Sequence, residues 1–314
     1  MEKNNNLIVT VSPHLSSGES VNKVMWAVVI ALLPAFIGSY FFFGIKAVYI
    51  TLVSVVTAVI LEAVSYKLMR RPVTVTDGSA VITGMLLAFN LPPTVPLWIP
   101  VLGSAVAILI AKVPFGGLGQ NIFNPALVGR AFLLAAYPVQ MTDWISSRFE
   151  KVVDISTYAT PLGIIKEKLS ESVPSYFNMF IGNHGGCIGE TSALLLILGG
   201  IYLLVRKIIT WHIPVTYILT VCLLTWVLGR DPLFNVLAGG LMLGAIYMAT
   251  DMVTSPVTNK GMIIFAIGCG VMTVIIRLFG NYPEGVSYSI LLMNACTPLI
   301  DRYAKPKKFG KLKY

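Results

Sequence analysis

The feature that most constrains this chain is a series of ten apolar runs of spanning or near-spanning length. Hydrophobic residues make up 56% of the sequence and charged residues only 12%, about half the charged fraction of a soluble domain. A helix needs roughly 20 apolar residues to cross the hydrocarbon core of a bilayer. The runs cover 24–43, 47–66, 79–90, 97–111, 121–137, 191–205, 213–228, 234–249, 262–278 and 286–300. The sequence therefore predicts an all-α integral membrane protein with about ten transmembrane helices.

Several runs are too short for a straight span. Runs 79–90 and 121–137 are bordered by Gly, Asn and Pro, which shorten or interrupt helices. Interrupted helices are tolerated inside a membrane where they lie beside a buried site. We therefore expect short or broken helices that border a ligand site or an ion path.

The two halves of the sequence resemble each other. Residues 78–90 and 239–251 are both Gly- and Ala-rich apolar runs that lead into a Pro-containing turn, and 124–126 and 294–295 both follow a Gly-rich turn. Small residues also recur simply because they allow close helix packing, so this similarity has an alternative explanation. With five segments in each half, an odd number, a true repeat would be inverted across the membrane. We predict two inverted five-helix repeats.

Basic residues in alternate loops predict the orientation. They share one side of the predicted membrane with the basic tail from 302 to 313: Lys67, Arg70, Arg71, Lys112, Arg206, Lys207 and Lys260. The positive-inside rule places this side, with both termini, in the cytoplasm. The polar stretch 1–20 also lacks the pattern of a cleavable signal.

This orientation divides the chain into five expected parts. They are a cytoplasmic N-terminal segment (1–23), a first membrane repeat (24–137), an extracytoplasmic loop (138–190), a second membrane repeat (191–300) and a basic cytoplasmic tail (301–314). The expected location is the cytoplasmic membrane of a bacterium or archaeon, with membrane lipid as the surrounding partner.

The net charge of +9 does not require a nucleic-acid partner, because the basic residues are spread over loops and one tail. We expect no nucleic-acid binding. The four cysteines contain no CxxC pair and the three histidines are scattered, so we expect neither a metal site nor a disulfide framework.

Six ionisable residues lie in or at the ends of apolar runs: Glu62, Asp77, Arg130, Asp251, Arg277 and Asp301. A charge at the membrane centre costs about 2.5–3.5 kcal/mol on insertion scales, so such residues usually pair or line a polar path. For Arg277 and Asp301 we expect side chains that reach the membrane interface. Asp77 and Asp251 sit in corresponding polar breaks, where either an ion path or an interfacial position would explain them.

Residues 115–121 form a Gly-rich segment before an expected helix that starts near Asn121. Glycines let the backbone approach a ligand closely, and a helix start favours anions. The spacing matches neither a Walker loop nor a dinucleotide fingerprint. A tight turn between membrane helices explains the segment without any ligand.

The polar stretch 154–162 stands out within the long loop. On its own, Thr160 followed by Pro161 is typical of a helix N-terminus, with Pro in the first turn.

Five segments together resemble one family: 76–84, 116–126, 189–192, 249–256 and 280–286. This is the family of the D subunit of the Rnf electron-transport complex and the B subunit of the sodium-pumping NADH:quinone reductase. The resemblance covers nearly the whole chain. The length of the chain is closer to that of the Rnf subunit than to that of the quinone-reductase subunit. It implies electron transfer between ferredoxin and NAD, coupled to translocation of Na⁺ or H⁺ across the membrane.

The resemblance also implies a covalent flavin. Family members carry FMN esterified through its phosphate to a threonine, and the matching residue here is Thr160. Asp154, Thr157 and Ala159 match the rest of the attachment motif, whereas Tyr158 stands where the family usually has Gly. We expect an exposed hydroxyl for this phosphoester. The flavin itself would be the redox group, with the protein tuning its potential.

Further expectations follow from the resemblance. A second, non-covalent riboflavin occurs in the quinone-reductase relatives, and Asp77 and Asn121 would be its neighbours here. The implied partners are the A, B, C, E and G subunits of Rnf, together with a flavin transferase for maturation. The chain would act as one subunit of an ion-translocating oxidoreductase without turnover of its own, and Asp77 and Asp251 would lie on its ion pathway. The alternative function is a flavin-free secondary transporter or channel of inverted-repeat architecture.

Overall fold

Helices form all the regular structure in the residues that the computed structural model describes, which are 20–71, 75–145, 160–167, 174–280 and 284–305. The first half contains α1 (Val21–Phe43), α2 (Ile45–Leu68), η1 (Val75–Asp77), α3 (Ser79–Phe89), α4 (Trp98–Leu109) and α5 (Pro125–Ala136). Three short helices follow, α6 (Pro138–Met141), α7 (Pro161–Glu167) and α8 (Tyr176–Ile181). The second half contains α9 (Ala193–Val205), α10 (His212–Val227), α11 (Pro232–Leu237), α12 (Leu241–Leu243), η2 (Gly244–Met248), α13 (Asn259–Phe279) and α14 (Val286–Tyr303).

Each of the ten predicted runs coincides with helix in the structure. The run 234–249 is divided into α11, α12 and the π-helical turn η2, as expected of a broken helix. By length and composition, three described helices can cross a membrane, namely α1, α2 and α13, while α3, α4, α5, α9 and α10 are apolar but shorter. The chain is therefore a multi-pass membrane protein, and ten spans stays a prediction.

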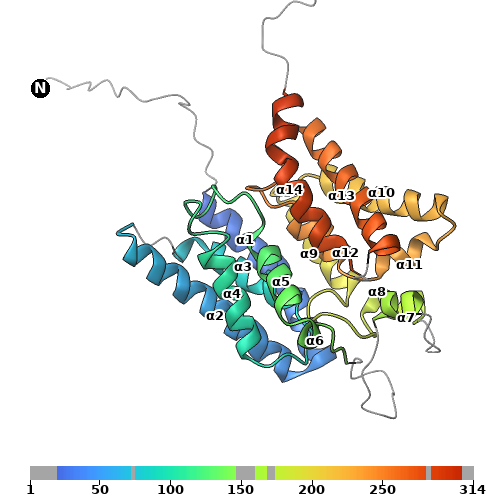
Figure 1. Ribbon diagram of the computed structural model, residues 1–314, viewed down its shortest axis with the longest axis horizontal. Coiled ribbons are helices and arrows are strands. Elements are labelled where there is room, and N and C mark those ends of the chain that lie inside the picture. The colour runs from blue at the N-terminus through green and yellow to red at the C-terminus, as the bar shows by residue number, and fades with distance from the viewer. Residues whose placement is uncertain (1–19, 72–74, 146–159, 168–173, 281–283, 306–314) are drawn as a thin grey trace, which may run out of the picture.

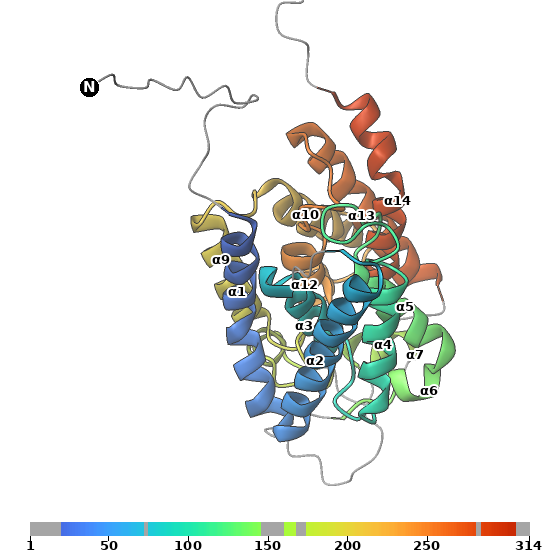
Figure 2. The ribbon, with the colours of Figure 1, turned by 90° about the vertical axis from the view of Figure 1, so that its left-hand side faces the viewer.

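The helices of the two halves pack in the same order. In the first half α2 packs on α3 and α4, and α4 packs on α5; in the second half α10 packs on α11, η2 and α13, and α13 packs on α14. The first helices of the halves, α1 and α9, lie side by side (Figures 1 and 2). Tyr247 of η2 stabilises this contact, because its hydroxyl donates to Ala31 O of α1 at 3.2 Å and to Leu196 O of α9 at 3.0 Å.

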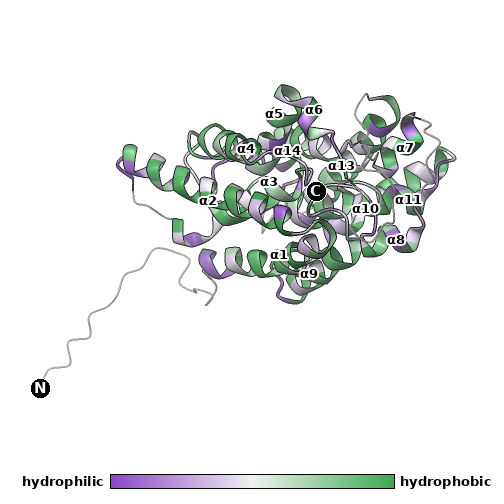
Figure 3. Ribbon diagram, turned by 90° about the horizontal axis from the view of Figure 1, so that it is seen from below, coloured by the Kyte–Doolittle hydropathy of each residue, from purple (hydrophilic) through white to green (hydrophobic). Residues whose placement is uncertain are grey.

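Large apolar side chains cover the outer surfaces of the long helices. Ile30 and Phe41 on α1, Leu52 and Val56 on α2 and Ile264 on α13 are all exposed, and Figure 3 shows hydrophobic colour along these helices. Soluble proteins rarely expose so large an apolar surface, whereas lipid covers it without cost. These faces are suited to contact with lipid or with the apolar surface of another membrane protein.

Gly84 allows α3 to cross α2 at backbone distance. A Cβ at this position would lie 2.6 Å from Val55 Cα and 3.0 Å from Ser54 O. The Ser54 hydroxyl also donates to Gly84 O at 2.8 Å. Close approach of helix backbones at small residues is a general means of helix packing in membranes.

Replacing Gly84 with alanine is expected to lower the stability of the protein by about 2 kcal/mol, because neither backbone can yield without separating the helices. The measurement is the melting temperature of the detergent-purified protein. Gly268→Ala is the matched control, since its added methyl group meets only the flexible end of Met293. Equal melting temperatures for the two variants would show that the α2–α3 crossing tolerates a methyl group.

Candidate functional site

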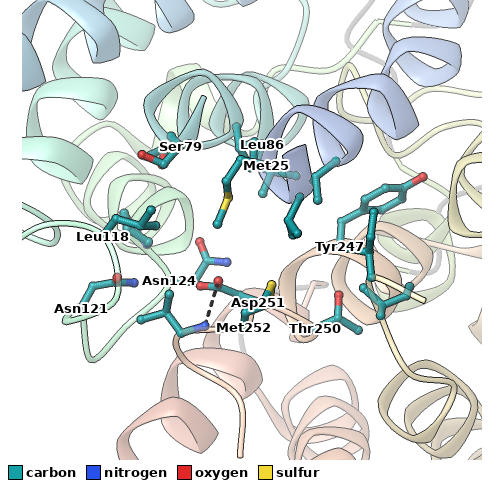
Figure 4. Close-up of a pocket in the computed structure, with 18 of the residues that line it drawn as sticks. Met25, Ser79, Leu86, Leu118, Asn121, Asn124, Tyr247, Thr250, Asp251 and Met252 are labelled. Carbon is teal, nitrogen blue, oxygen red and sulfur yellow. Dashed lines mark hydrogen bonds between the residues drawn. The ribbon is translucent and has the colours of Figure 1, made fainter. Parts of the chain in front are cut away.

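A pocket lies among the start of α1, the start of α3, the turn before α5 and the end of η2. It holds about 760 Å³, counting the space open to the surroundings. One part of its wall is apolar, with Met25, Val28, Leu86, Leu118 and Met252. The polar part consists of Ser79, Lys112, Asn121, Asn124 and Asp251. Figure 4 shows Ser79 and Asn124 from the first half and Asp251 from the second half around this pocket, which we call the central pocket. A mostly apolar cavity with a few convergent polar groups is typical of a small-molecule or cofactor site.

Asn124 sets the floor of the central pocket. Its Oδ1 accepts from the backbone N–H groups of Ala126 and Leu127 at 3.1 and 3.4 Å, so it caps α5, with Pro125 in the first turn. Its Nδ2 donates to Met248 O at 3.4 Å, which connects the pocket floor to η2. The expected helix start near Asn121 is therefore wrong by four residues.

Asn121 lies in the Gly-rich turn that precedes this helix. Its Nδ2 donates to Phe123 O at 3.1 Å, while its side chain lines the central pocket. Gly116, Gly117 and Gly119 have positive φ angles of 120°, 93° and 91°. Only glycine adopts these angles readily, so the prediction of a tight turn is confirmed.

The two aspartates end up in different positions. Asp251 lines the central pocket, and its carboxylate accepts from Val253 N at 3.3 Å and Thr254 Oγ1 at 3.2 Å. Asp77 lies behind the wall, where Oδ1 accepts from the backbone N and the hydroxyl of Ser79 at 2.8 and 2.7 Å. Ser79 lines the pocket and Asp77 does not, so Asp77 is connected to the site only through its hydrogen bond with Ser79.

Lys112 is the buried cation of the central pocket. It is 2% exposed, and its Nζ donates to Glu62 Oε2 at 2.8 Å and to Ser79 Oγ at 2.7 Å. Glu62 is fully buried on α2, so the expectation that it pairs is confirmed. Lys112 lies in the turn after α4, as predicted for a loop residue, but the chain folds its side chain inward against a carboxylate. The sequence analysis did not place Lys112 in the site. The available signal was a lysine beside a long apolar run, with a single glutamate, Glu62, in an earlier apolar run that could pair with it.

Thr160 begins α7 at the end of the helix bundle opposite the start of α1 (Figures 1 and 2). Its Oγ1 accepts from Gly163 N at 3.2 Å, and Pro161 occupies the first turn, so the prediction of a helix N-terminus is confirmed. The side chain is 5% exposed, which differs from the exposed hydroxyl expected for a phosphoester. Asp154, Thr157 and Ala159, with Tyr158, lie outside the described residues.

The short helix α7 is fixed to the second half at two points. The Lys166 Nζ donates to Gly280 O. A Cβ at Gly239 would lie 2.8 Å from Leu162 Cδ1, so Leu162 packs directly on that backbone. This docking explains the burial of the Thr160 hydroxyl.

A second group of polar side chains, the charged cluster, lies buried beside α7. It consists of Arg130, Cys187, Glu190, Arg277 and Glu284. Arg130 of α5 forms an ion pair with Glu284, which confirms that it is paired, and this bridge connects the two halves. The Sγ atom of Cys187 and one carboxylate oxygen from each of Glu190 and Glu284 all lie within 4.8 Å of one another. Sequence reasoning placed no site at these three residues; the signal was the presence of two glutamates in Gly-rich segments beside apolar runs.

Arg277 is buried inside the protein. The residue is 8% exposed, and its guanidinium donates to Asn235 O at 2.6 Å and to Ala238 O at 3.0 Å. The broken run around α11 leaves these backbone carbonyls free to receive it, and its position relative to the membrane interface stays a prediction. Asp301 is partly exposed at the end of α14 and accepts from Val257 N at 3.2 Å.

The fold and the central pocket thus define a class, a multi-pass membrane protein with a pocket between two packed halves. A family model described as the NQR2, RnfD, RnfE family matches residues 8–310. The chain belongs to this family.

Individual relatives agree with this assignment. The chain is 51% identical to the D subunit of the Na(+)-translocating ferredoxin:NAD(+) oxidoreductase complex of Acetobacterium woodii, over 98% of this chain and 96% of that protein. It is also 51% identical to the D subunit of the proton-translocating ferredoxin:NAD(+) oxidoreductase complex of Clostridium ljungdahlii, over 98% and 97% of the two chains. The D subunit of an ion-translocating oxidoreductase complex of Stutzerimonas stutzeri is 41% identical over 93% of each chain.

Proposed function

We propose that this chain is the membrane-embedded D subunit of an Rnf-type complex, which transfers electrons between ferredoxin and NAD⁺ and couples the transfer to translocation of Na⁺ or H⁺. The observation that carries this proposal is the near-complete match, at 51% identity, to two proteins with these names. The chain has no turnover of its own and acts within the assembly with the A, B, C, E and G subunits. The flavin-free transporter or channel is the weaker alternative, since these relatives are named as parts of oxidoreductase complexes.

Thr160 is the proposed attachment residue for FMN, joined through a phosphoester by a flavin transferase. Asp154, Thr157 and Ala159 complete the sequence that this enzyme would recognise. Because the Thr160 hydroxyl is buried and caps α7, the first turn of α7 has to open for attachment. The cost is modest, since one capping hydrogen bond contributes about 1 kcal/mol. When bound, FMN supplies a redox centre that accepts and donates electrons.

The central pocket is the proposed site of a second, non-covalent flavin of the riboflavin type. Its mixed lining suits an isoalloxazine: Met25 and Leu86 would supply apolar contacts, and the Asn121 side chain would supply a polar group. Lys112 brings a positive charge to the same wall, and Asp77 acts on it through Ser79. A buried charge beside a flavin is one means by which a protein tunes its potential.

The repeated packing order of the halves supports the proposed inverted repeat. Two five-helix halves of opposite orientation would place both termini in the cytoplasm and the loop with Thr160 outside. The central pocket and α7, at opposite ends of the bundle, would then lie towards opposite sides of the membrane.

Intact-mass measurement of the chain purified from its native membranes tests the flavin proposal. The expected mass exceeds that of the sequence by one FMN less one water. An unmodified mass, from cells that contain the flavin transferase, would refute the covalent flavin.

Asp77→Asn and Asp251→Asn are each expected to slow ion-dependent electron transfer by about tenfold, which equals about 1.4 kcal/mol in the barrier. Both carboxylates are held at or behind the wall of the central pocket, and removing one negative charge weakens a cation path there. The covalent flavin should remain. Asp231→Asn is the control, because this exposed residue caps α11 and asparagine caps equally well. Unchanged ion dependence in both pocket variants would remove these residues from the path.

A further inference from the structure

Glu190 is a buried carboxyl group with one oxygen left without a hydrogen-bond partner. It lies in the non-helical segment between α8 and α9 and is 6% exposed. Its Oε1 accepts from Cys187 N at 3.3 Å, whereas Oε2 has no partner among the described residues. An ionised carboxylate in such surroundings is costly unless a cation pairs with it.

The cation nearest to Glu190 already has a partner. Arg130 of α5 forms its ion pair with Glu284 Oε2, and it also donates to Asn90 Oδ1 at 2.5 Å. Glu284, at the start of α14, keeps its other oxygen, Oε1, free of partners in the described part of the chain. The charged cluster therefore holds two carboxyl groups and two guanidiniums, and its one ion pair among the described residues joins Arg130 to Glu284.

A second cation, Arg277, lies close enough to interact electrostatically with Glu190 and Glu284, but it forms no ion pair with either among the described residues. Arg277 of α13 directs two of its nitrogens to the carbonyls of Asn235 and Ala238. Cys187 and His184 belong to the same segment as Glu190, and both are buried. Burial lowers the pKa of His184 to about 4, so its imidazole is neutral.

Two neighbouring carboxyl groups in a low-dielectric site resist ionising together. Burial first, and the adjacent Glu284 carboxylate second, raise the pKa of the Glu190 carboxyl to about 8. The ion pair with Arg130 stabilises the negative charge on Glu284, whereas Glu190 has no direct ion pair among the described residues.

We propose that Glu190 and Glu284 form a binding site for one exchangeable proton, which resides on Glu190 while Glu284 remains ionised against Arg130. On release, the Glu190 O–H bond breaks and the proton passes to water, leaving the electron pair on the Glu190 carboxylate. Arg130 and Glu284 line a cavity of about 490 Å³, counting its open space, together with Thr142 and Ser287. Glu190 does not line this cavity itself, so its proton would reach the surroundings past Glu284.

This site lies in the seam between the two halves, since Arg130 comes from the first and Glu284 from the second. A Cβ at Gly240 would lie 2.6 Å from Glu190 Oε2, so the backbone of the second half closes over the free oxygen. Movement of the halves relative to each other would therefore change the affinity of the site for its proton. The proton site stands independently of the proposed flavin.

Infrared difference spectroscopy on the purified complex, titrated from about pH 6 to about pH 10, tests the inference. The C=O band of a protonated carboxylic acid should disappear with a midpoint of about pH 8. Glu190→Gln should lack this titrating band. Glu284→Gln should move its midpoint down by about one pH unit or more, because the neighbouring negative charge is gone and Arg130 is free to pair with Glu190.

Asp231→Asn is the matched control. The Tyr176 hydroxyl donates to the Asp231 carboxylate and holds its pKa below the usual value, so Asp231 stays ionised throughout the titration. The band should be unchanged in this variant. An unchanged titrating band in Glu190→Gln, or a midpoint that shifts when Na⁺ replaces K⁺, would overturn the proton site. The mass of the same chains reports the covalent flavin separately, so failure of the flavin proposal leaves this titration valid.

Discussion

Replacing Thr160 with valine is expected to remove all covalently bound flavin from the chain. Valine keeps the branched shape of threonine but has no hydroxyl, so no phosphoester can form. The capping hydrogen bond to Gly163 N is also lost, which costs about 1 kcal/mol and leaves the helix bundle folded. The measurement is flavin fluorescence of the chain on a denaturing gel, together with its intact mass.

Two matched variants make this result specific to Thr160. Thr160→Ser keeps a hydroxyl at the start of α7 and should retain flavin, whereas Thr157→Val changes the other threonine of the motif and should leave the acceptor in place. Flavin that persists in Thr160→Val but disappears in Thr157→Val would move the attachment to Thr157. Loss in both valine variants, with retention in Thr160→Ser, would mean that the transferase reads Thr157 as part of its recognition sequence.

Replacing Lys112 with methionine is expected to destabilise the protein by about 3–5 kcal/mol, because it leaves the Glu62 carboxylate buried without a cation. Thermal melting of the detergent-purified protein measures this effect. The non-covalent flavin content of the preparation should fall as well, since Lys112 lines the central pocket.

The double variant Glu62→Gln/Lys112→Met provides the control for the Lys112 prediction. It removes both charges, so most of the stability should return while the flavin content stays low. A double variant as unstable as Lys112→Met alone would show that packing, and not the ion pair, makes Lys112 necessary.

The sequence predicted the helical segments well because apolar length and Gly, Asn and Pro positions act locally. The tight turn at Gly116–Gly119 follows from such local rules, whereas the division of run 234–249 into three pieces was not predicted. Thr160 was predicted as a helix start for the same reason, and the structure places it there.

Errors in placing charged side chains arise because their environment depends on distant segments. Lys112 is a loop residue, as predicted, but its burial could not be predicted because its partner Glu62 lies 50 positions earlier. The burial of Arg277 could not be predicted either, because nothing local reveals that the carbonyls near Ala238 are free. Glu284 and Arg130 lie 154 positions apart, so no local pattern could have joined them.

The hydrogen bond from Tyr247 to Ala31 has a consequence for the synthesis of the protein. It joins residues 216 positions apart, on the first long helix and on the broken segment of the second half. When α1 leaves the ribosome, neither α9 nor Tyr247 has yet been made. The side of α1 that later contacts them therefore stays without these partners until most of the chain has been synthesised. A first half produced alone would lack this partner permanently, whereas two half-chains produced together could complete each other in the membrane.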